Sequence, residues 1–328
     1  MSKINNVLVI GGQGYVGSAL VPQLLKRYRV TTLDTGWYMT GQYKPDTNLT
    51  IINGDVRDRS ALKHAMQNQD AVIHLACVSN DPSFELNPTL GKSINLDSFP
   101  GVIDCLRESQ VKRFIYASSS SVYGIKEQKD VIETDSCEPL TDYSLFKLKC
   151  EDLLRDAHLP LDWTIVRPST ICGWAPRLRL DLVVNILTIH ALVNSRIMVH
   201  GGNQLRPNLH IRDMVGAYVA LLEAPADKIT HQVFNVGFEN MTVMEIARKV
   251  KAAMGARFVE IDKIPSNDNR SYHVNSDKIA STIGFKPRWS IQHAINSIVI
   301  AYAEGKIREP LTNPLYYNIK MMQELNIT

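Results

Sequence analysis

The chain has 328 residues, of which 45% are hydrophobic, enough for one large domain or two smaller domains that share an interface. Its 36 basic and 33 acidic side chains leave a net charge of +3, which argues against nucleic acid or a membrane as the main partner. No apolar run reaches the length of a membrane span, and the five widely spaced cysteines include no Cys-x-x-Cys pair, so we expect a cytoplasmic protein without a disulfide framework or a metal site.

Short apolar runs alternate with helical stretches through the first half of the chain. Strands are expected at residues 7–10, 30–34, 50–55, 71–76, 113–117 and 163–167. Strands that are buried on both faces and separated by helices are typical of a parallel sheet with helices on both sides. The expected fold class is therefore α/β, with a Rossmann-type doubly wound parallel sheet.

A glycine-rich loop, Gly11-x-x-Gly14-x-x-Gly17, separates the first expected strand from a helix. Glycine permits the tight turn and lets the backbone approach a pyrophosphate, while the helix N-terminus offers free N–H groups. Asp34 ends the second strand, where a carboxylate accepts both ribose hydroxyls and repels a 2′-phosphate, so NAD is favoured over NADP; the alternative is a solvated acid at a strand end. Asp55-Val56 follows the third strand and is expected at the adenine edge, although a turn or helix cap also explains this aspartate.

Tyr143 and Lys147 are four residues apart, so on a helix they share one face. A free phenol has a pKa of about 10. A lysine ammonium one turn away and a cationic nicotinamide ring both favour the phenolate, which suits the pair to moving a proton together with a hydride. Ser119 follows the fifth strand at the carboxyl edge of the sheet, where ligands bind in such folds, and its hydroxyl can donate to a substrate oxygen. We therefore predict Ser119, Tyr143 and Lys147 as the catalytic group.

The regular alternation ends after Gly173. A basic stretch and a helix near 182–192 follow, and then a helix at 210–222 and a strand at 232–236 are expected to return to the sheet. The rest of the chain is expected to hold helices, a short strand and a polar loop at 265–272, before a weakly patterned tail at 316–328. We expect an NAD-binding domain made of residues 1–173 and 209–241, capped by a smaller, discontinuous α/β substrate-binding domain made of residues 174–208 and 242–328.

Together these segments resemble the extended short-chain dehydrogenase/reductase family, in its nucleotide-sugar epimerase/dehydratase branch. The matching segments are residues 11–17, 74–77, 118–124, 143–147, 167–168, 206–213, 234–237 and 284–287. The resemblance spans almost the whole chain and implies a nucleotide-diphosphate sugar as substrate. By analogy it also implies a homodimer, with the helix that carries Tyr143 and a helix near 96–109 pairing across a two-fold axis.

The resemblance also assigns residues to the two ligands. The residues expected to bind NAD are Gly11, Gly14, Tyr15, Val16, Gly17, Asp34, Asp55, Val56, Leu75, Ala76, Asn95, Tyr143 and Lys147. The residues expected to bind the substrate are Ser119, Ser120, Arg179, Arg206 and Arg270. Arg206 and Arg270 are expected on the substrate diphosphate, which the planar guanidinium group suits better than an ammonium. His210 and Asp213 are expected to join the two domains.

Members of this family share a first step, the oxidation of a sugar hydroxyl, and then differ. A 4,6-dehydratase needs an acid–base pair where Ser120 and Ser121 stand, so dehydration is disfavoured. A 4-epimerase returns the hydride to the other face of the keto-sugar, whereas a 4-dehydrogenase releases it, and a 4-ketoreductase runs the reverse reaction. We expect a nucleotide-sugar 4-epimerase, with the dehydrogenase or ketoreductase as the alternative.

Residues 175–185 depart from the usual epimerase pattern. This Pro-Arg-x-Arg-Leu-Asp-Leu stretch is similar to that of GDP-heptose 4-dehydrogenases, which questions a plain UDP-hexose as substrate. Arg177 and Arg179 either hold a phosphate or sugar, or belong to a solvated basic loop. A non-catalytic NAD-binding regulator is a remote alternative, because such a protein has no need of Ser119, Tyr143 and Lys147 together.

Overall fold

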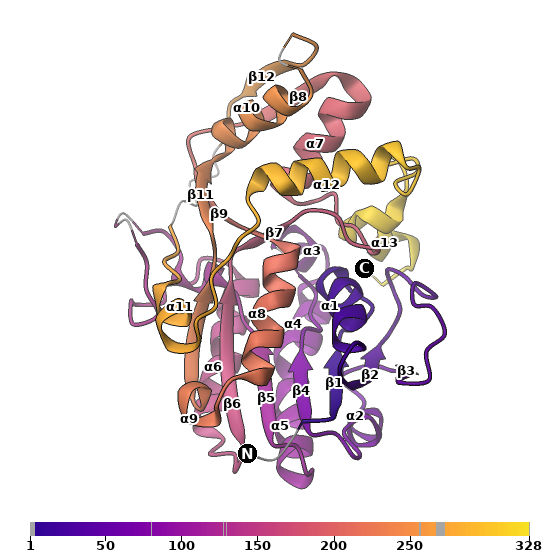
Figure 1. Ribbon diagram of the computed structural model, residues 1–328, viewed down its shortest axis with the longest axis vertical. Helices are drawn as coiled ribbons and strands as arrows, with labels where there is room; N and C mark the ends of the chain where they lie inside the picture. Colours follow the sequence, from indigo (N-terminus) through magenta and orange to yellow (C-terminus); the bar gives the residue numbers. More distant parts are fainter. Residues whose placement is uncertain are drawn as a thin grey trace.

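The centre of the molecule is a seven-stranded parallel sheet with helices on both faces (Figure 1). The structure, a computed structural model, describes residues 4–79, 81–126, 128, 130–255, 257–266 and 273–327. From one edge to the other the strands are β10 (Gln232–Val236), β6 (Asp162–Pro168), β5 (Arg113–Ala117), β4 (Ala71–His74), β1 (Asn6–Ile10), β2 (Arg29–Asp34) and β3 (Leu49–Asn53). The predicted Rossmann-type α/β class is confirmed.

Alternate residues of each central strand point to opposite faces of the sheet, as the two-residue period of a strand requires. In β1, Leu8 and Ile10 pack against α2 (Arg59–Ala65), α5 (Phe99–Glu108) and α6 (Asp142–Asp156). Val7 and Val9 pack on the other side, against α1 (Tyr15–Leu24) and α8 (Ile211–Glu223). A strand with apolar residues at every position is therefore buried on both faces. The two helices of the predicted dimer interface, α5 and α6, lie on one face, and the dimer stays a prediction.

The predicted strands are present, but β3 and β4 each end two residues before the expected position, and for β4 a backbone crossing explains the difference. The N–H groups of Leu75 and Ala76 both donate to the carbonyl oxygen of Ile10, so the chain leaves the sheet ladder there. Gly11 makes this crossing possible, because its φ is +85° and an added Cβ would lie 2.6 Å from the Ala76 nitrogen. The loop after β4 is thereby drawn against the glycine loop.

A smaller part stands above the carboxyl ends of the central strands (Figure 1). It contains a three-stranded sheet of β7 (Thr170–Cys172), β9 (Leu205–His210) and β11 (Glu239–Thr242), and a parallel pair of β8 (Arg196–His200) and β12 (Glu260–Ile264). Three helices surround its core, α7 (Val183–Asn194), α10 (Val243–Ala253) and α12 (Ile291–Ala303). The three-stranded sheet takes strands from both predicted domains, and the proposed division into domains stays a prediction.

The C-terminal tail forms a helix that the sequence did not predict, α13 (Asn318–Glu324). It packs against α3 (Asp81–Leu86), and Met322 is fully buried in the core beneath α5 and α6. The remaining elements are α4 (Pro88–Lys92), a π-helical turn at Ser93–Asp97, 3₁₀ turns at Ser120–Tyr123 and Pro314–Tyr316, α9 (Ala226–Ile229) and α11 (Asp277–Ile283). None of the helices in the described residues is long and apolar enough to cross a lipid bilayer.

The buried imidazole of His74, at the end of β4, is expected to make stability depend on pH. Its ring stacks on Phe99 at 5.9 Å and its Nδ1 has no hydrogen-bond partner among the described residues. Burial, and next the Lys147 ammonium, lowers the pKa of His74 to about 3. The unfolded chain takes up this proton near pH ~6.5, so the free energy of unfolding falls as the pH falls, by roughly 2 kcal/mol between pH 8 and pH 5.

Urea unfolding of the parent and of a His74→Phe variant at both pH values measures this effect. Between pH 8 and pH 5, the free energy of unfolding of the variant is expected to fall by roughly 2 kcal/mol less than that of the parent, whatever the stability of the variant at pH 8. His64→Gln, on the exposed surface of α2, is the matched control and should behave as the parent does. An unchanged pH dependence in His74→Phe would contradict the prediction.

Candidate active site

A cavity of about 400 Å³ lies at the carboxyl ends of the central strands, where the smaller part of the molecule covers the sheet. It brings together most of the predicted site residues. Those that line it are Gly11, Gly14, Tyr15, Val16, Gly17, Asp34, Asp55, Val56, Leu75, Ala76, Ser119, Ser120, Tyr143, Lys147, Arg179 and Arg206. Residues from distant parts of the sequence therefore converge on one site.

The glycine loop has the shape of a phosphate cradle. Gly17 packs tightly against the loop, since an added Cβ would lie 2.3 Å from the Gly12 carbonyl oxygen. Gly14 differs, because its added Cβ would meet only the Gly11 carbonyl oxygen, at 3.4 Å, and would otherwise project into free space at the N-terminus of α1. No side chain caps that helix end. A diphosphate fits the space and the free N–H groups.

The two acidic residues predicted for the cofactor also hold the loops of the protein in place. Asp34 accepts hydrogen bonds from the backbone N–H of Gln13 at 2.8 Å and of Gly36 at 2.9 Å, which joins the glycine loop to the end of β2. Burial raises the pKa of Asp34. Asp55 forms a turn with Arg57 and an ion pair with its guanidinium at 2.6 Å. Asp55 therefore has the structural role considered in the sequence analysis and also lines the cavity.

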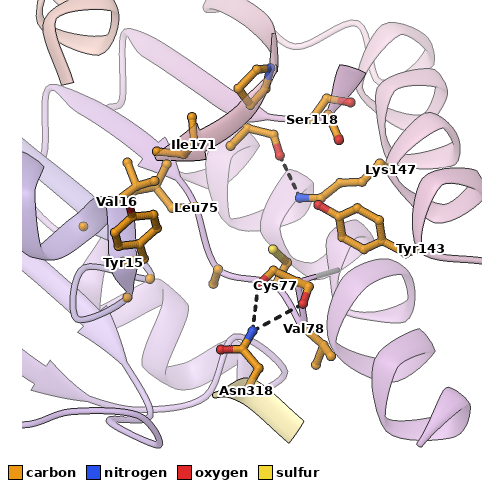
Figure 2. Close-up of a pocket in the computed structure, with 18 of the residues that line it drawn as sticks. Tyr15, Val16, Leu75, Cys77, Val78, Ser118, Tyr143, Lys147, Ile171 and Asn318 are labelled. Carbon is orange, nitrogen blue, oxygen red and sulfur yellow. Dashed lines mark hydrogen bonds between the residues drawn. The ribbon is translucent and has the colours of Figure 1, made fainter. Parts of the chain in front are cut away.

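Tyr143 and Lys147 lie at the start of α6 (Figure 2). A capping box between Thr141 and Ser144 fixes where this helix begins. The Lys147 ammonium is buried and donates to the carbonyl oxygen of Ala117, at the end of β5, at 2.7 Å. The predicted pair thus lies on one face of the helix, beside the strand end that leads to Ser119.

The protein groups around Tyr143 do not acidify its phenol. Burial, together with Cys77 and Asp81, raises the pKa of Tyr143, while Arg179 and a hydrogen bond with Ser119 act in the opposite direction. The sequence analysis expected a field that lowers this pKa. The difference arises because sequence spacing shows which charges are close but does not show the cost of removing the phenolate from water.

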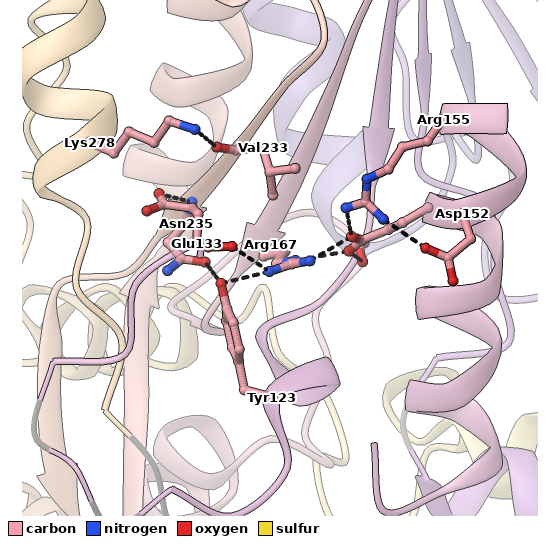
Figure 3. Close-up of polar contacts among 10 residues, drawn as sticks. Tyr123, Glu133, Asp152, Arg155, Arg167, Val233, Asn235 and Lys278 are labelled. Carbon is pink, nitrogen blue, oxygen red and sulfur yellow. Dashed lines mark hydrogen bonds and ion pairs between the residues drawn. The ribbon is translucent and has the colours of Figure 1, made fainter. Parts of the chain in front are cut away.

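A buried polar network fixes α6 to the sheet, and the sequence analysis did not predict it. Glu151 is fully buried, one turn beyond Lys147, and accepts hydrogen bonds from Ser118 at 2.5 Å and from Arg167 at 2.7 and 2.9 Å. Arg167, on β6, also donates to the Tyr123 hydroxyl at 2.8 Å; Figure 3 shows its guanidinium reaching that ring. The i, i+4 spacing from Lys147 to Glu151 was the sequence signal for this network, because it places Glu151 on the same face of the helix as Lys147.

The basic segment after β7 is buried, so the alternative of a solvated loop is wrong. Arg177 is 3% exposed and Arg179 is 8% exposed. Arg179 pairs with Asp181 through two hydrogen bonds, at 2.9 and 3.1 Å, and donates to the Ser79 hydroxyl at 2.8 Å. Asn318 of α13 also donates to Ser79, and Figure 2 shows it reaching the loop that carries Cys77 and Val78. The tail thus supplies a wall residue that the sequence analysis missed.

One predicted residue lies away from the cavity, and another falls outside the residues that the structure describes. Asn95 does not line the cavity, because its side-chain amide is bonded to the backbone N–H and carbonyl of Val78, at 2.8 and 2.9 Å, and shapes the loop after β4. Arg270 lies outside the described residues. His210 and Asp213 tie α8 to the segment before α12, through the Trp289 ring at 5.8 Å and the Trp289 N–H at 2.8 Å respectively.

Comparison with known proteins fits this geometry. The model of the NAD dependent epimerase/dehydratase family matches residues 7–237, which is well over half of the chain. The chain belongs to this family. The predicted family is therefore confirmed, NAD is the cofactor, and the protein is an enzyme of the extended short-chain dehydrogenase/reductase type.

Relatives of this family member are distant but span nearly the whole chain. A UDP-glucose 4-epimerase of Lacticaseibacillus casei is 25% identical over 313 residues, which cover 86% of this chain and 92% of that protein. The structure of a UDP-glucuronic acid 4-epimerase from Bacillus cereus superposes with a TM-score of 0.83 at 23% identity, covering 91% of this chain and 99% of the other. A dTDP-glucose 4,6-dehydratase from Streptomyces venezuelae gives 0.83 at 21% identity, with 94% and 100% covered. Proteins that catalyse different reactions therefore share this fold.

Proposed function

We propose that this protein is an NAD-dependent nucleotide-sugar 4-epimerase. The observation that supports this proposal best is the meeting of Ser119, Tyr143 and Lys147 in the cavity that the glycine loop also lines. The sequence relative from Lacticaseibacillus casei, a UDP-glucose 4-epimerase, agrees with it. A sugar carbinol beside Tyr143 has an acid–base group within reach, which such an oxidation requires.

In the proposed mechanism, Ser119 and Tyr143 act on the C4 hydroxyl of the sugar. Ser119 orients the hydroxyl by a hydrogen bond, and Tyr143 takes its proton and later returns it. NAD, when bound, supplies the hydride acceptor and a positive ring charge, which offsets the effect of burial on the Tyr143 pKa. Lys147, whose ammonium donates to the Ala117 carbonyl, is proposed to bond the nicotinamide ribose as well. Arg206 is proposed to hold the substrate diphosphate.

Related proteins suggest two other reactions, dehydration and net oxidation of the sugar, and the chain supports them less well than epimerisation. Dehydration requires an acid–base pair after Ser119, where Ser120 and Ser121 stand, and the Ser121 hydroxyl is bonded to Ser119 at 2.9 Å. Net oxidation to a 4-keto-sugar, or its reverse, remains the second candidate. The segment that holds Arg177 and Arg179 favours this candidate, since it departs from the usual epimerase pattern. Both arginines are buried.

Incubation of the enzyme and NAD with UDP-, GDP-, CDP- and dTDP-sugars separates these candidates. We expect isomerised sugar, detected by NMR, without net formation of NADH, detected by absorbance. Stoichiometric NADH with a keto-sugar would establish the dehydrogenase instead. Absence of any turnover across the panel, with NAD binding intact, would favour the non-catalytic regulator. The nucleotide and sugar, the homodimer and the cytoplasmic location stay predictions.

A further inference from the structure

Arg177 is placed against the phosphate-binding end of α1 although it belongs to the segment after β7. Its backbone N–H donates to the Ser18 hydroxyl at 3.2 Å, within the first turns of α1. Its side chain lines the cavity and is 3% exposed. The guanidinium carbon lies 4.4 Å from the centre of the Tyr38 ring, and Nη2 donates to Asn318 Oδ1 at 2.5 Å. Packing on both sides fixes the orientation of this cation.

The charge of Arg177 has no direct ion-pair partner among the described residues, and the attraction of nearby Asp181 offsets its burial only in part. Its buried Nε has no hydrogen-bond partner among the described residues. The hydroxyl of Tyr38, which lines the same cavity, is a second buried polar group that has no hydrogen-bond partner in the part of the chain that the structure describes. Arg179 contrasts with Arg177, because two hydrogen bonds join it to Asp181. A buried guanidinium without a counter-charge is costly, and an anionic ligand in the cavity removes that cost.

The neighbours of Arg177 indicate which anion this is. Asp34, the predicted ribose ligand, is close enough for Arg177 to lower its pKa against the larger effect of burial. Both Asp34 oxygens accept backbone N–H groups, of Gln13 and Gly36, and no ion pair among the described residues joins this carboxylate to Arg177. Arg177 therefore lies on the cofactor side of the cavity, between the ribose end and the glycine loop.

We propose that Arg177 binds the diphosphate of NAD, with Tyr38 donating a second hydrogen bond. The glycine loop offers backbone N–H groups from the sheet, and Arg177 offers a guanidinium from the segment that covers the cavity. The cofactor is thereby held by both parts of the molecule, which slows its release. This proposal rests on NAD as the cofactor and does not depend on whether the reaction is epimerisation or net oxidation.

Calorimetric titration of three ligands tests the proposal with the full-length protein. ADP-ribose carries the cofactor diphosphate, adenosine lacks it, and UDP carries the diphosphate of the substrate. In Arg177→Gln, the Kd for ADP-ribose is expected to rise roughly 10- to 100-fold, the loss of charge-assisted hydrogen bonds, while the Kd values for adenosine and UDP stay within twofold. Arg248→Gln, on the exposed surface of α10, is the matched charge control and should change none of the three.

Two further measurements separate binding from structure. Because the variant removes an unmatched buried cation and keeps a hydrogen-bonding side chain beside Asn318, its ligand-free unfolding midpoint should equal or exceed that of the parent. Arg177→Lys, which keeps the charge, should recover part of the ADP-ribose affinity. A loss shared equally by adenosine and ADP-ribose, together with a lower midpoint, would show a structural role and overturn the proposal. A loss confined to UDP would place the residue on the substrate diphosphate and overturn it as well.

Discussion

Replacing Tyr143 with phenylalanine is expected to slow the oxidation of the sugar by roughly 10²- to 10⁴-fold, the usual contribution of a positioned acid–base group. The variant keeps the ring that packs at the start of α6 and removes only the oxygen that exchanges the proton. The Lys147 ammonium stays bonded to the Ala117 carbonyl, so the wall beside the nicotinamide is unchanged. NAD should therefore bind with nearly the affinity of the parent enzyme.

Single-turnover formation of NADH and titration with NAD measure the two halves of this prediction. Tyr28→Phe is the matched control, because this hydroxyl lies on the exposed surface, bonded to Glu223. The control should react as fast as the parent enzyme. Turnover by Tyr143→Phe at the parent rate would exclude Tyr143 as the acid–base group. Loss of NAD binding would show that the Tyr143 hydroxyl is needed to hold the cofactor and would contradict the second half of the prediction.

Breaking the ion pair between Glu151 and Arg167 is expected to have the largest effect on stability. Both side chains are buried, at 0% and 3% exposed, so removing the Glu151 carboxylate leaves the Arg167 guanidinium without a charged partner. Glu151→Gln should lower the free energy of unfolding by roughly 3–5 kcal/mol. The same change weakens the hydrogen bond from Ser118, since an amide oxygen is a poorer acceptor than a carboxylate, and loosens α6, so activity should fall in the fraction that stays folded.

Urea unfolding at neutral pH measures this loss, and a second variant isolates its cause. Replacing Glu151 and Arg167 together by methionine removes both charges, so much of the stability should return. Glu108→Gln disturbs an exposed pair with Arg59 and Lys63 and should have little effect. A double variant no more stable than Glu151→Gln would show that packing, and not the unmatched charge, governs the site.

Much of the fold and the catalytic group could be predicted because local patterns determine them. The strands are continuous apolar runs, the glycine loop is a short motif, and the spacing of Tyr143 and Lys147 is that of one helical turn. The elements that were missed lack such patterns. The strand β7 has three residues and the helix α13 has seven, so both are too short to show a hydrophobic period in the sequence. Tertiary contacts stabilise such short elements.

The electrostatics of the site were the least predictable part. The sequence identifies Arg177, Glu151 and Tyr143 as ionisable, but it does not show that all three lie away from bulk water. Burial sets the sign of the Tyr143 pKa shift and makes Arg177 a candidate ligand instead of a solvated charge. Both results depend on which segments line the cavity, and these segments are far apart in the sequence.

The contribution of Asn318 to the cavity wall means that one short helix serves two purposes. Asn318 lines the cavity at the first turn of α13, and Met322, one turn further along the same helix, is buried in the core. Displacing α13 would therefore open the cavity and expose apolar core surface together, so ligand binding and folding are coupled through this helix.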